Sequence, residues 1–280
     1  MSKVALVTDS TADLPISLAE QNNIHVVPVK THFGQRVFVG QDLTPEAFYI
    51  KLASADMLPF TSPPTAEEFT EVYNKLLQDY EQVVSLHIAA ELSETVNSAR
   101  MASRDYGGRV HVVDSRSVSL KLAIMVLEAA RLLAEGREVA EVAREVVVQG
   151  SNIEFFFTIE TLEYLQRGGR ISRVRGMMGS LLNIMPILRL TNDGSFDTVG
   201  TVRRREKALE EIATSFERLA AGRTPRLLGI IHGGAREDAS KLKQMLEQRL
   251  SVKCSLQTTV GPVVGTHTGP GSVGAAVLFQ

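Results

Sequence analysis

The chain has 280 residues, of which 44% are hydrophobic and 22% charged, the balance of a globular protein with a substantial core. Its 30 basic residues nearly match its 32 acidic residues, which argues against a protein that binds nucleic acid through a basic surface. Cys254 is the one cysteine, so an intramolecular disulfide and a thiolate metal cluster are both excluded.

The apolar run at the start of the chain is too short for the core of a signal peptide. No other run approaches the roughly 18 consecutive apolar residues of a transmembrane helix. The single cysteine also fits a reducing compartment. We therefore expect a soluble protein in the cytoplasm.

Short β-rich runs alternate with helical patterns through the first half of the chain. Strands are predicted over residues 4–8, 82–88 and 109–114. Helices are predicted from Pro45 onwards, after the capping box of Thr65 and Glu68, and over residues 117–134. This alternation predicts parallel strands joined by right-handed crossovers, and hence an α/β domain.

The pattern changes near residue 152. The predicted elements are then a strand over 153–159, a hairpin around the turn 191–195, helices over 204–221 and 237–250, a strand over 226–231 and closing strands. We therefore expect two α/β domains. Residues 1–152 form a domain with a parallel sheet, and residues 153–280 form a domain with a mixed sheet.

Hydroxyl side chains gather where the first-half strands end, the edge at which open parallel sheets bind ligands. They are Ser10 and Thr11 after the first strand, Ser93 and Thr95 after the second, Ser115 and Ser117 after the third, and Thr61 and Ser62 in a turn stiffened by prolines. We interpret Thr11, Thr65 and Ser117 as residues that cap helices or form hydrogen bonds within turns. Thr61, Ser62 and Ser93 also suit a small anion, because hydroxyls and free helix N–H groups donate to it.

Residues 260–274 contain five glycines and two prolines around His267. Glycine permits positive φ and close approach while proline fixes φ, so this stretch is predicted to be a shaped loop. We expect the loop to present His267, with Thr266 and Thr268 beside it.

Two apolar stretches exceed what one buried helix stripe needs: the three phenylalanines at 155–157 and the methionine-rich residues 177–185. Part of this is ordinary core. Adaptable methionine surface beside glycines is also typical of a pocket for a flexible apolar ligand. A small anionic head site together with a long apolar lining indicates a fatty acid.

Two alternatives remain open on the residues alone. The first is a small-substrate hydrolase with Ser93 as nucleophile, His267 as base and Asp9 or Asp114 as its orienting group, although no Gly-x-Ser-x-Gly elbow surrounds Ser93. The second is a structural module in which the hydroxyls serve only as caps. A metal site is not indicated, because no histidines recur at i, i+4 spacing.

Six motifs, in order along the whole chain, resemble the DegV family. They are Thr8-Asp9-Ser10, Thr61-Ser62-x-Pro64, Leu92-Ser93-x-Thr95, Asp114-Ser115, Tyr164-Leu165-x-x-Gly168-Gly169-Arg170-Ile171 and Gly265-x-His267-x-Gly269-Pro270-Gly271. The resemblance implies a two-domain α/β protein that holds one long-chain fatty acid, such as palmitate, between its domains. It implies a binding subunit without chemistry or cofactor of its own, which presents the carboxylate to an ATP-dependent bacterial fatty acid kinase in phospholipid metabolism.

Carried over residue by residue, the resemblance implies that Thr61 and Ser93 hold the carboxylate and that His267 closes the site. Ser62 and Thr95 belong to the same motifs and are included as binding residues. Arg170 is expected to face the kinase partner or, transiently, the membrane surface, with a solvated loop arginine as the alternative. No nucleic-acid partner is implied.

The chain departs from the family pattern at Glu94, where the family usually has glycine. We expect this side chain to point away from the site, because a glutamate turned inwards would repel a carboxylate. Arg167 stands where lysine is common and keeps the charge. We also expect binding to improve below about pH 7 if His267 protonates beside the carboxylate.

Overall fold

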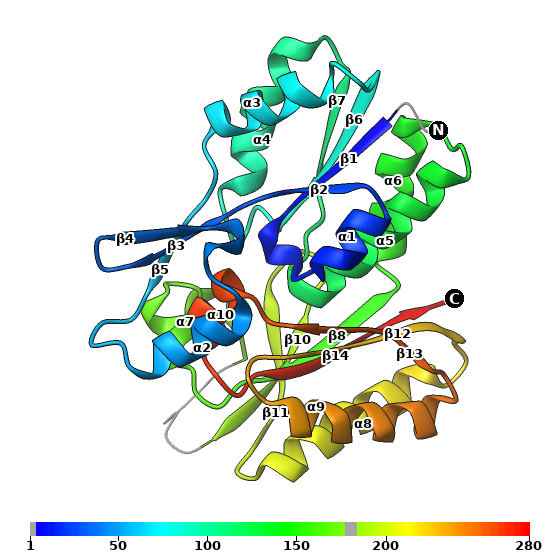
Figure 1. Ribbon diagram of the computed structural model, residues 1–280. Helices are drawn as coiled ribbons and strands as arrows, with labels where there is room; N and C mark the ends of the chain where they lie inside the picture. Colours follow the sequence, from blue (N-terminus) through cyan, green and yellow to red (C-terminus); the bar gives the residue numbers. More distant parts are fainter. Residues whose placement is uncertain (1–3, 177–183) are drawn as a thin grey trace.

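The computed structural model describes residues 4–176 and 184–280, and within them the chain forms three β-sheets (Figure 1). Most of the methionine-rich segment 177–185, predicted to line a pocket, lies outside the described residues. In the described part, no helix is both long enough and apolar enough to cross a bilayer.

The first sheet has four parallel strands in the order β2-β1-β6-β7. These are β1 (Val4–Asp9), β2 (Ile24–Val27), β6 (Gln82–His87) and β7 (Val110–Asp114). The helices of this region are α1 (Ile16–Gln21), α3 (Ala66–Leu76), α4 (Thr95–Ser103), α5 (Ser119–Ala134) and α6 (Val139–Gly150), with short 3-10 turns η1 (Ser10–Ala12) and η3 (Arg104–Tyr106). The predicted parallel α/β arrangement is confirmed.

Successive side chains of a strand face opposite sides of a sheet, and this pattern places helices on both faces. Ala5 and Val7 of β1 pack in one cluster with Phe69 of α3. Leu6, between them, packs in another cluster with α5.

The second sheet has seven strands in the order β13-β12-β14-β8-β10-β11-β9 and contains both parallel and antiparallel pairs, as predicted. The strands are β8 (Ile153–Thr158), β9 (Val174–Arg175), β10 (Met185–Leu190), β11 (Phe196–Val202), β12 (Pro225–His232), β13 (Cys254–Thr259) and β14 (Val273–Phe279). Helices α8 (Arg205–Ala220) and α9 (Arg236–Leu250) cover one face.

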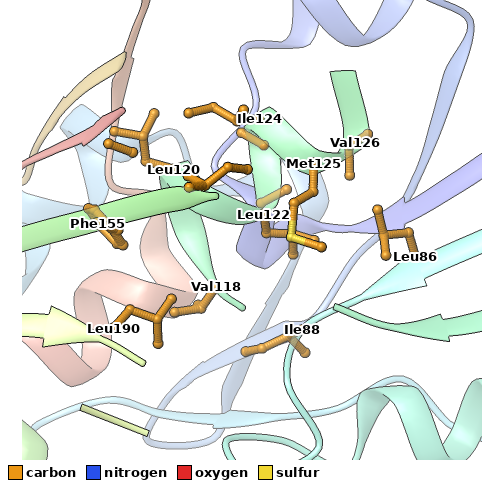
Figure 2. Packing of buried hydrophobic residues seen from close by; sticks show 14 of the residues in the cluster. Leu86, Ile88, Val118, Leu120, Leu122, Ile124, Met125, Val126, Phe155 and Leu190 are labelled. Atoms are coloured by element: carbon orange, nitrogen blue, oxygen red, sulfur yellow. The ribbon is translucent and has the colours of Figure 1, made fainter. Parts of the chain in front are cut away.

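Helix α5 fills the space between the two larger sheets. It contacts β1 of the first sheet and β8, β12 and β14 of the second. Figure 2 shows Leu120, Leu122 and Met125 of this segment among side chains of both sheets. A helix that is apolar on nearly every side is a buried helix, which explains its composition. Because α5 precedes residue 152 yet packs on both sheets, a domain division at residue 152 stays our proposal.

A third, antiparallel sheet has the order β4-β3-β5, with β3 (Lys30–Phe33), β4 (Arg36–Val39) and β5 (Phe60–Ser62). Beside it lie α2 (Pro45–Ala53), α7 (Glu163–Arg167) and α10 (Pro262–Thr268), with the turns η2 (Gly40–Asp42) and η4 (Ile171–Arg173) nearby in the chain. Two predictions were wrong here. The predicted turn at Thr61 is a strand, and the predicted loop at His267 contains a helix.

Candidate functional site

A cavity lies where the carboxyl ends of the first sheet meet the second sheet. It holds about 1020 Å³ of space free of protein atoms, counting the solvent at its mouth. Much of its wall is apolar and includes Ile88, Val118, Phe155, Phe157, Ile231 and Val263. Thr61, Ser93, Arg170 and His267 supply polar groups.

The polar residues mark the mouth of the cavity. Thr61, Arg170 and His267 also line a second, outer hollow, whose other walls include Met57 and Phe60. Residues that line both spaces stand between them. The polar groups are thus concentrated towards one end of the cavity, and its other walls are mainly apolar.

Thr61 and His267 meet although 206 positions separate them in the sequence. Thr61 Oγ1 and His267 Nε2 lie 2.9 Å apart. Strand β5 supplies Thr61, and the last turn of α10 supplies His267. This pairing brings two predicted binding residues together at the mouth.

The glycines around His267 allow close packing of α10. A Cβ atom at Gly265 would lie 2.6 Å from Phe48 Cε1 of α2, and one at Gly168 would overlap the His267 ring. The hydroxyls of the flanking Thr266 and Thr268 donate to carbonyls of their own helix, and Thr268 also lines the cavity. Composition thus indicated a shaped segment correctly, although its shape is a helix in a tight groove.

Ser93 and Thr95 form a second pair at the start of α4. Their hydroxyl oxygens lie 2.9 Å apart, and the Thr95 backbone N–H donates to Ser93 Oγ at 3.3 Å. Ser93 lines the cavity, whereas Thr95 is fully buried behind it. The Glu94 carboxylate accepts from Asn97 Nδ2 at 2.8 Å, yet Glu94 also lines the cavity, so the expectation that it points away from the site stays a prediction.

Ser62 is the predicted site residue that the structure separates from the others. Its Oγ lies 2.7 Å from His32 Nε2, whereas its neighbour Thr61 contacts His267. Adjacent residues of a strand point to opposite faces, so these two hydroxyls cannot serve one ligand. Ser62 is also not among the residues that line the cavity, so its contacts give no support to the prediction that it joins the head site.

Arg170 is half-buried and held by backbone carbonyls. Its Nε and Nη2 donate to Leu92 O at 3.3 and 3.2 Å, and its Nη1 donates to Gly168 O at 2.6 Å. Burial, and then the charge of Arg173, lower the pKa of its guanidinium. These contacts exclude a freely solvated loop arginine and place a positive charge at the mouth. Arg167 is exposed and pairs with Glu163 at 2.9 Å.

His267 is neutral near pH 7 in this structure. Burial, and then the charge of Arg170, lower the pKa of its imidazole to about 4. Its Nδ1 has no hydrogen-bond partner among the described residues. The desolvated ring beside an arginine disfavours a second positive charge in the ligand-free site, so the expectation that binding improves below about pH 7 if His267 protonates beside a carboxylate stays a prediction.

The hydrolase arrangement is absent from the described part of the cavity. Asp9 Oδ2 lies 3.0 Å from His87 Nδ1, and Asp114 Oδ1 accepts from the backbone N–H groups of Ala90 and Arg116. Neither carboxylate orients His267. Sequence reasoning selected aspartates of the right type, but both are engaged elsewhere.

Sequence reasoning missed several residues of the cavity wall. Ser119 contributes a polar group, and Val260, Val263, Val264 and Val273 contribute apolar surface. These valines lie close to the glycines around His267 in the sequence, but the pattern gave no sign that they face a cavity. Ser119 follows a predicted cap and gives no separate signal.

Comparison with known proteins is consistent along the whole chain. A family model described as "Uncharacterised protein, DegV family" matches residues 3–280. A DegV domain-containing protein of Deinococcus radiodurans is 34% identical over 284 residues and covers 98% of each chain. One of Staphylococcus aureus (strain N315) is 32% identical over 279 residues and covers 99% of each.

Solved structures of similar fold include fatty-acid-binding proteins. A DegV family protein of Thermus thermophilus, described by its fatty acid binding, matches with a TM-score of 0.92 and 35% identity over 99% of each chain. DegV of Bacillus subtilis, described as a fatty acid binding protein, matches with a TM-score of 0.90 and 30% identity over 100% of each.

Proposed function

The chain belongs to the DegV family, and from this premise we propose that it binds one long-chain fatty acid in the cavity. One observation carries the proposal: an apolar cavity ends at the hydroxyl groups of Thr61 and Ser93, and each lies within hydrogen-bond distance of a side chain that can donate to it. Such hydroxyls direct their protons towards a ligand, and an anion with a long apolar chain matches the space.

His267 prepares Thr61 to donate. A neutral imidazole with its proton on Nε2 donates to Thr61 Oγ1 across the 2.9 Å contact. The Thr61 hydroxyl proton is then free for one oxygen of the carboxylate. Histidine therefore acts through the threonine, and its neutral form is sufficient.

Thr95 prepares Ser93 in the same way. Its backbone N–H and its hydroxyl both lie within hydrogen-bond distance of Ser93 Oγ. With these two donors, the Ser93 proton is directed to the second carboxylate oxygen, and Arg170 adds a nearby positive charge. Hydrogen bonds to a charged acceptor are about twice as strong as neutral ones.

The acyl chain supplies most of the affinity. Each methylene that enters the apolar cavity contributes roughly 0.8 kcal/mol before ordering costs. Phe155 and Phe157 of β8 and the valines near α10 form walls for it. The head group then fixes orientation, with the carboxylate at the mouth.

We further propose that the protein presents this carboxylate to an ATP-dependent kinase and has no catalysis of its own. A carboxylate oxygen attacks the γ-phosphorus of ATP, ADP leaves, and an acyl phosphate forms. The outer hollow supports this role, because a partner that covers it reaches Thr61 and His267. Met57 and Phe60, which are 69% and 55% exposed, suit transient contact with a membrane surface beside Arg170.

Mass spectrometry of small molecules released from denatured protein tests the binding proposal. We expect a near-stoichiometric fatty acid in the wild type and a reduced amount in Ser93→Ala and His267→Ala. Ser62→Ala, altered on the opposite face of β5, is the matched control and should retain it. A wild type without lipid, and without a thermal shift on adding palmitate, would sink the proposal.

The kinase role has a separate test. Palmitate-loaded protein is mixed with radiolabelled ATP and the catalytic subunit of a bacterial fatty acid kinase. Labelled acyl phosphate should form only with all components present. Formation without the kinase subunit would instead assign catalysis to this chain.

A further inference from the structure

The carboxylate of Asp13 joins three segments that are distant in the sequence. Its Oδ1 accepts from the backbone N–H of Gly261 at 2.8 Å, and its Oδ2 accepts from Ser119 Oγ at 2.5 Å. Thr258 Oγ1 donates to the Asp13 carbonyl. One residue near the start of the chain thus holds the beginnings of both α5 and α10.

Asp13 carries a buried carboxyl group, and removing such a group from water costs free energy. It is 7% exposed, and no cation of the described residues forms an ion pair with it. Burial raises the pKa of its carboxyl to about 7. Its backbone is also left-handed, with φ 50°, which is uncommon outside glycine. A buried carboxylate with only two hydrogen-bond donors adds little net stability to the fold. Stability alone therefore does not account for Asp13 at this position.

The bond to Gly261 reaches His267 through a short, stiff element. Gly261 is the N-cap of α10, and His267 stands at the other end of this seven-residue helix, roughly 10 Å away. Two further bonds hold the approach to α10: Tyr49 OH donates to Val260 O at 3.2 Å, and Val260 N donates to His232 O at 2.9 Å. A shift at Gly261 therefore moves the imidazole relative to Thr61.

We propose that Asp13 is a positioning residue of the head site, which sets α10 so that His267 meets Thr61; this inference rests on the proposed fatty-acid function. Asp13 touches no ligand itself. Its second contact, the hydrogen bond that it accepts from Ser119 Oγ, anchors Asp13 to the start of α5.

Delipidated variants with palmitate as the probe, in equilibrium dialysis, test the inference. Asp13→Ala should weaken palmitate binding about tenfold, the effect of losing one charged hydrogen bond. Asp13→Asn keeps an acceptor for Gly261 and should stay within about threefold. Thr258→Val removes a tether of the same segment but leaves the carboxylate, and should also stay within about threefold. If Asp13→Ala does not fold, Asp13→Glu, which displaces the acceptor by one methylene, replaces it.

A double-variant cycle separates positioning from a general structural role. In a His267→Ala background, Asp13→Ala should weaken binding no further, because its effect passes through the histidine. An equal loss in both backgrounds, or wild-type affinity in Asp13→Ala, overturns the inference.

The nitrogen NMR signals of the His267 imidazole, measured in ligand-free protein, test whether Asp13 positions this ring. These signals should shift in Asp13→Ala and keep their wild-type positions in Asp13→Asn and Thr258→Val. Unchanged signals in Asp13→Ala overturn the inference. A wild type that fails to bind palmitate refutes the proposed function, and the NMR result then stands as the test of Asp13.

Discussion

Two clusters of the same residue types have opposite character in this molecule. The closed cluster is Asp9, His87, Ser85 and Tyr73, and each member bonds to the next at 3.0, 2.6 and 2.8 Å. The open cluster is Thr61, His267, Ser93, Thr95 and Arg170, and most of it lines the cavity. Histidine and hydroxyls occur in both, so residue type alone does not mark a site.

Access and unused hydrogen-bonding capacity are what distinguish the clusters. Asp9, Ser85 and His87 are 0% exposed, although they stand in the order of a hydrolytic triad. A substrate cannot reach them. Asp9 instead fixes the backbone N–H of Ile88 at 3.0 Å and that of Thr11 at 3.0 Å, and both residues line the cavity. The closed cluster therefore fixes the backbone of two residues that line the cavity, whereas the open cluster supplies its polar side chains.

The largest expected effect is on stability, in the closed cluster. His87→Ala removes the imidazole partner of the buried Asp9 carboxylate and leaves only the donors of Ile88 and Thr11, which should lower the free energy of unfolding by about 3–5 kcal/mol. His267→Ala, at the cavity mouth, should lower it by only about 1 kcal/mol. Urea unfolding of delipidated protein measures both.

A second substitution controls for the lost packing. Asp9→Asn added to His87→Ala removes the buried charge and should restore part of the stability. Equal losses in the two single histidine variants would mean that the clusters do not differ as described.

The arrangement of strands and helices in each half could be predicted because local patterns determine it. Runs of β-branched residues and capping boxes are visible within a few positions, and the parallel first sheet followed from their alternation. The third sheet was missed because β5 has only three residues and pairs with β3, some thirty positions away.

The site was predicted in part for the same reason. Ser93 follows a predicted strand, so its place at the sheet edge could be inferred. The side that Thr61 faces depends on the pairing of β5, and without this pairing Ser62 could not be told from Thr61. Asp13 gave no signal, because its partners Gly261 and Ser119 lie more than 100 residues away.

The next effect is on affinity and compares the two neighbours on β5. Thr61→Val removes the hydroxyl at nearly constant volume and should weaken palmitate binding about tenfold, as expected for one bond to a charged group. Ser62→Ala breaks the contact with His32 on the other face and should change binding less than about twofold. Equilibrium dialysis with palmitate measures the affinity of both delipidated variants. Similar losses would place both hydroxyls in one site, contrary to the strand geometry.

The smallest expected effect is the pH dependence of binding, which depends on the state of His267. Its pKa of about 4 lies below the ordinary value of 6.5, so the ring is neutral from about pH 6 upwards. Stability that the neutral ring contributes is thus present above about pH 6.5 and is lost as pH falls towards 4. Between pH 6.5 and 8.5 the ring does not titrate, and palmitate affinity should change less than about twofold.

Asp13 is the other group that titrates in this range, since its pKa is about 7. The stability that Asp13 contributes depends on pH in the opposite direction from that of His267. It is greatest below about pH 4 and falls as pH rises towards 7, by on the order of 1 kcal/mol per pH unit. The affinity profile is therefore measured in wild type and in Asp13→Asn, which removes this titration. A steep gain in affinity below pH 7 that persists in Asp13→Asn and disappears in His267→Gln would show that the histidine binds the carboxylate as a cation. A flat profile in both backgrounds supports the neutral relay through Thr61.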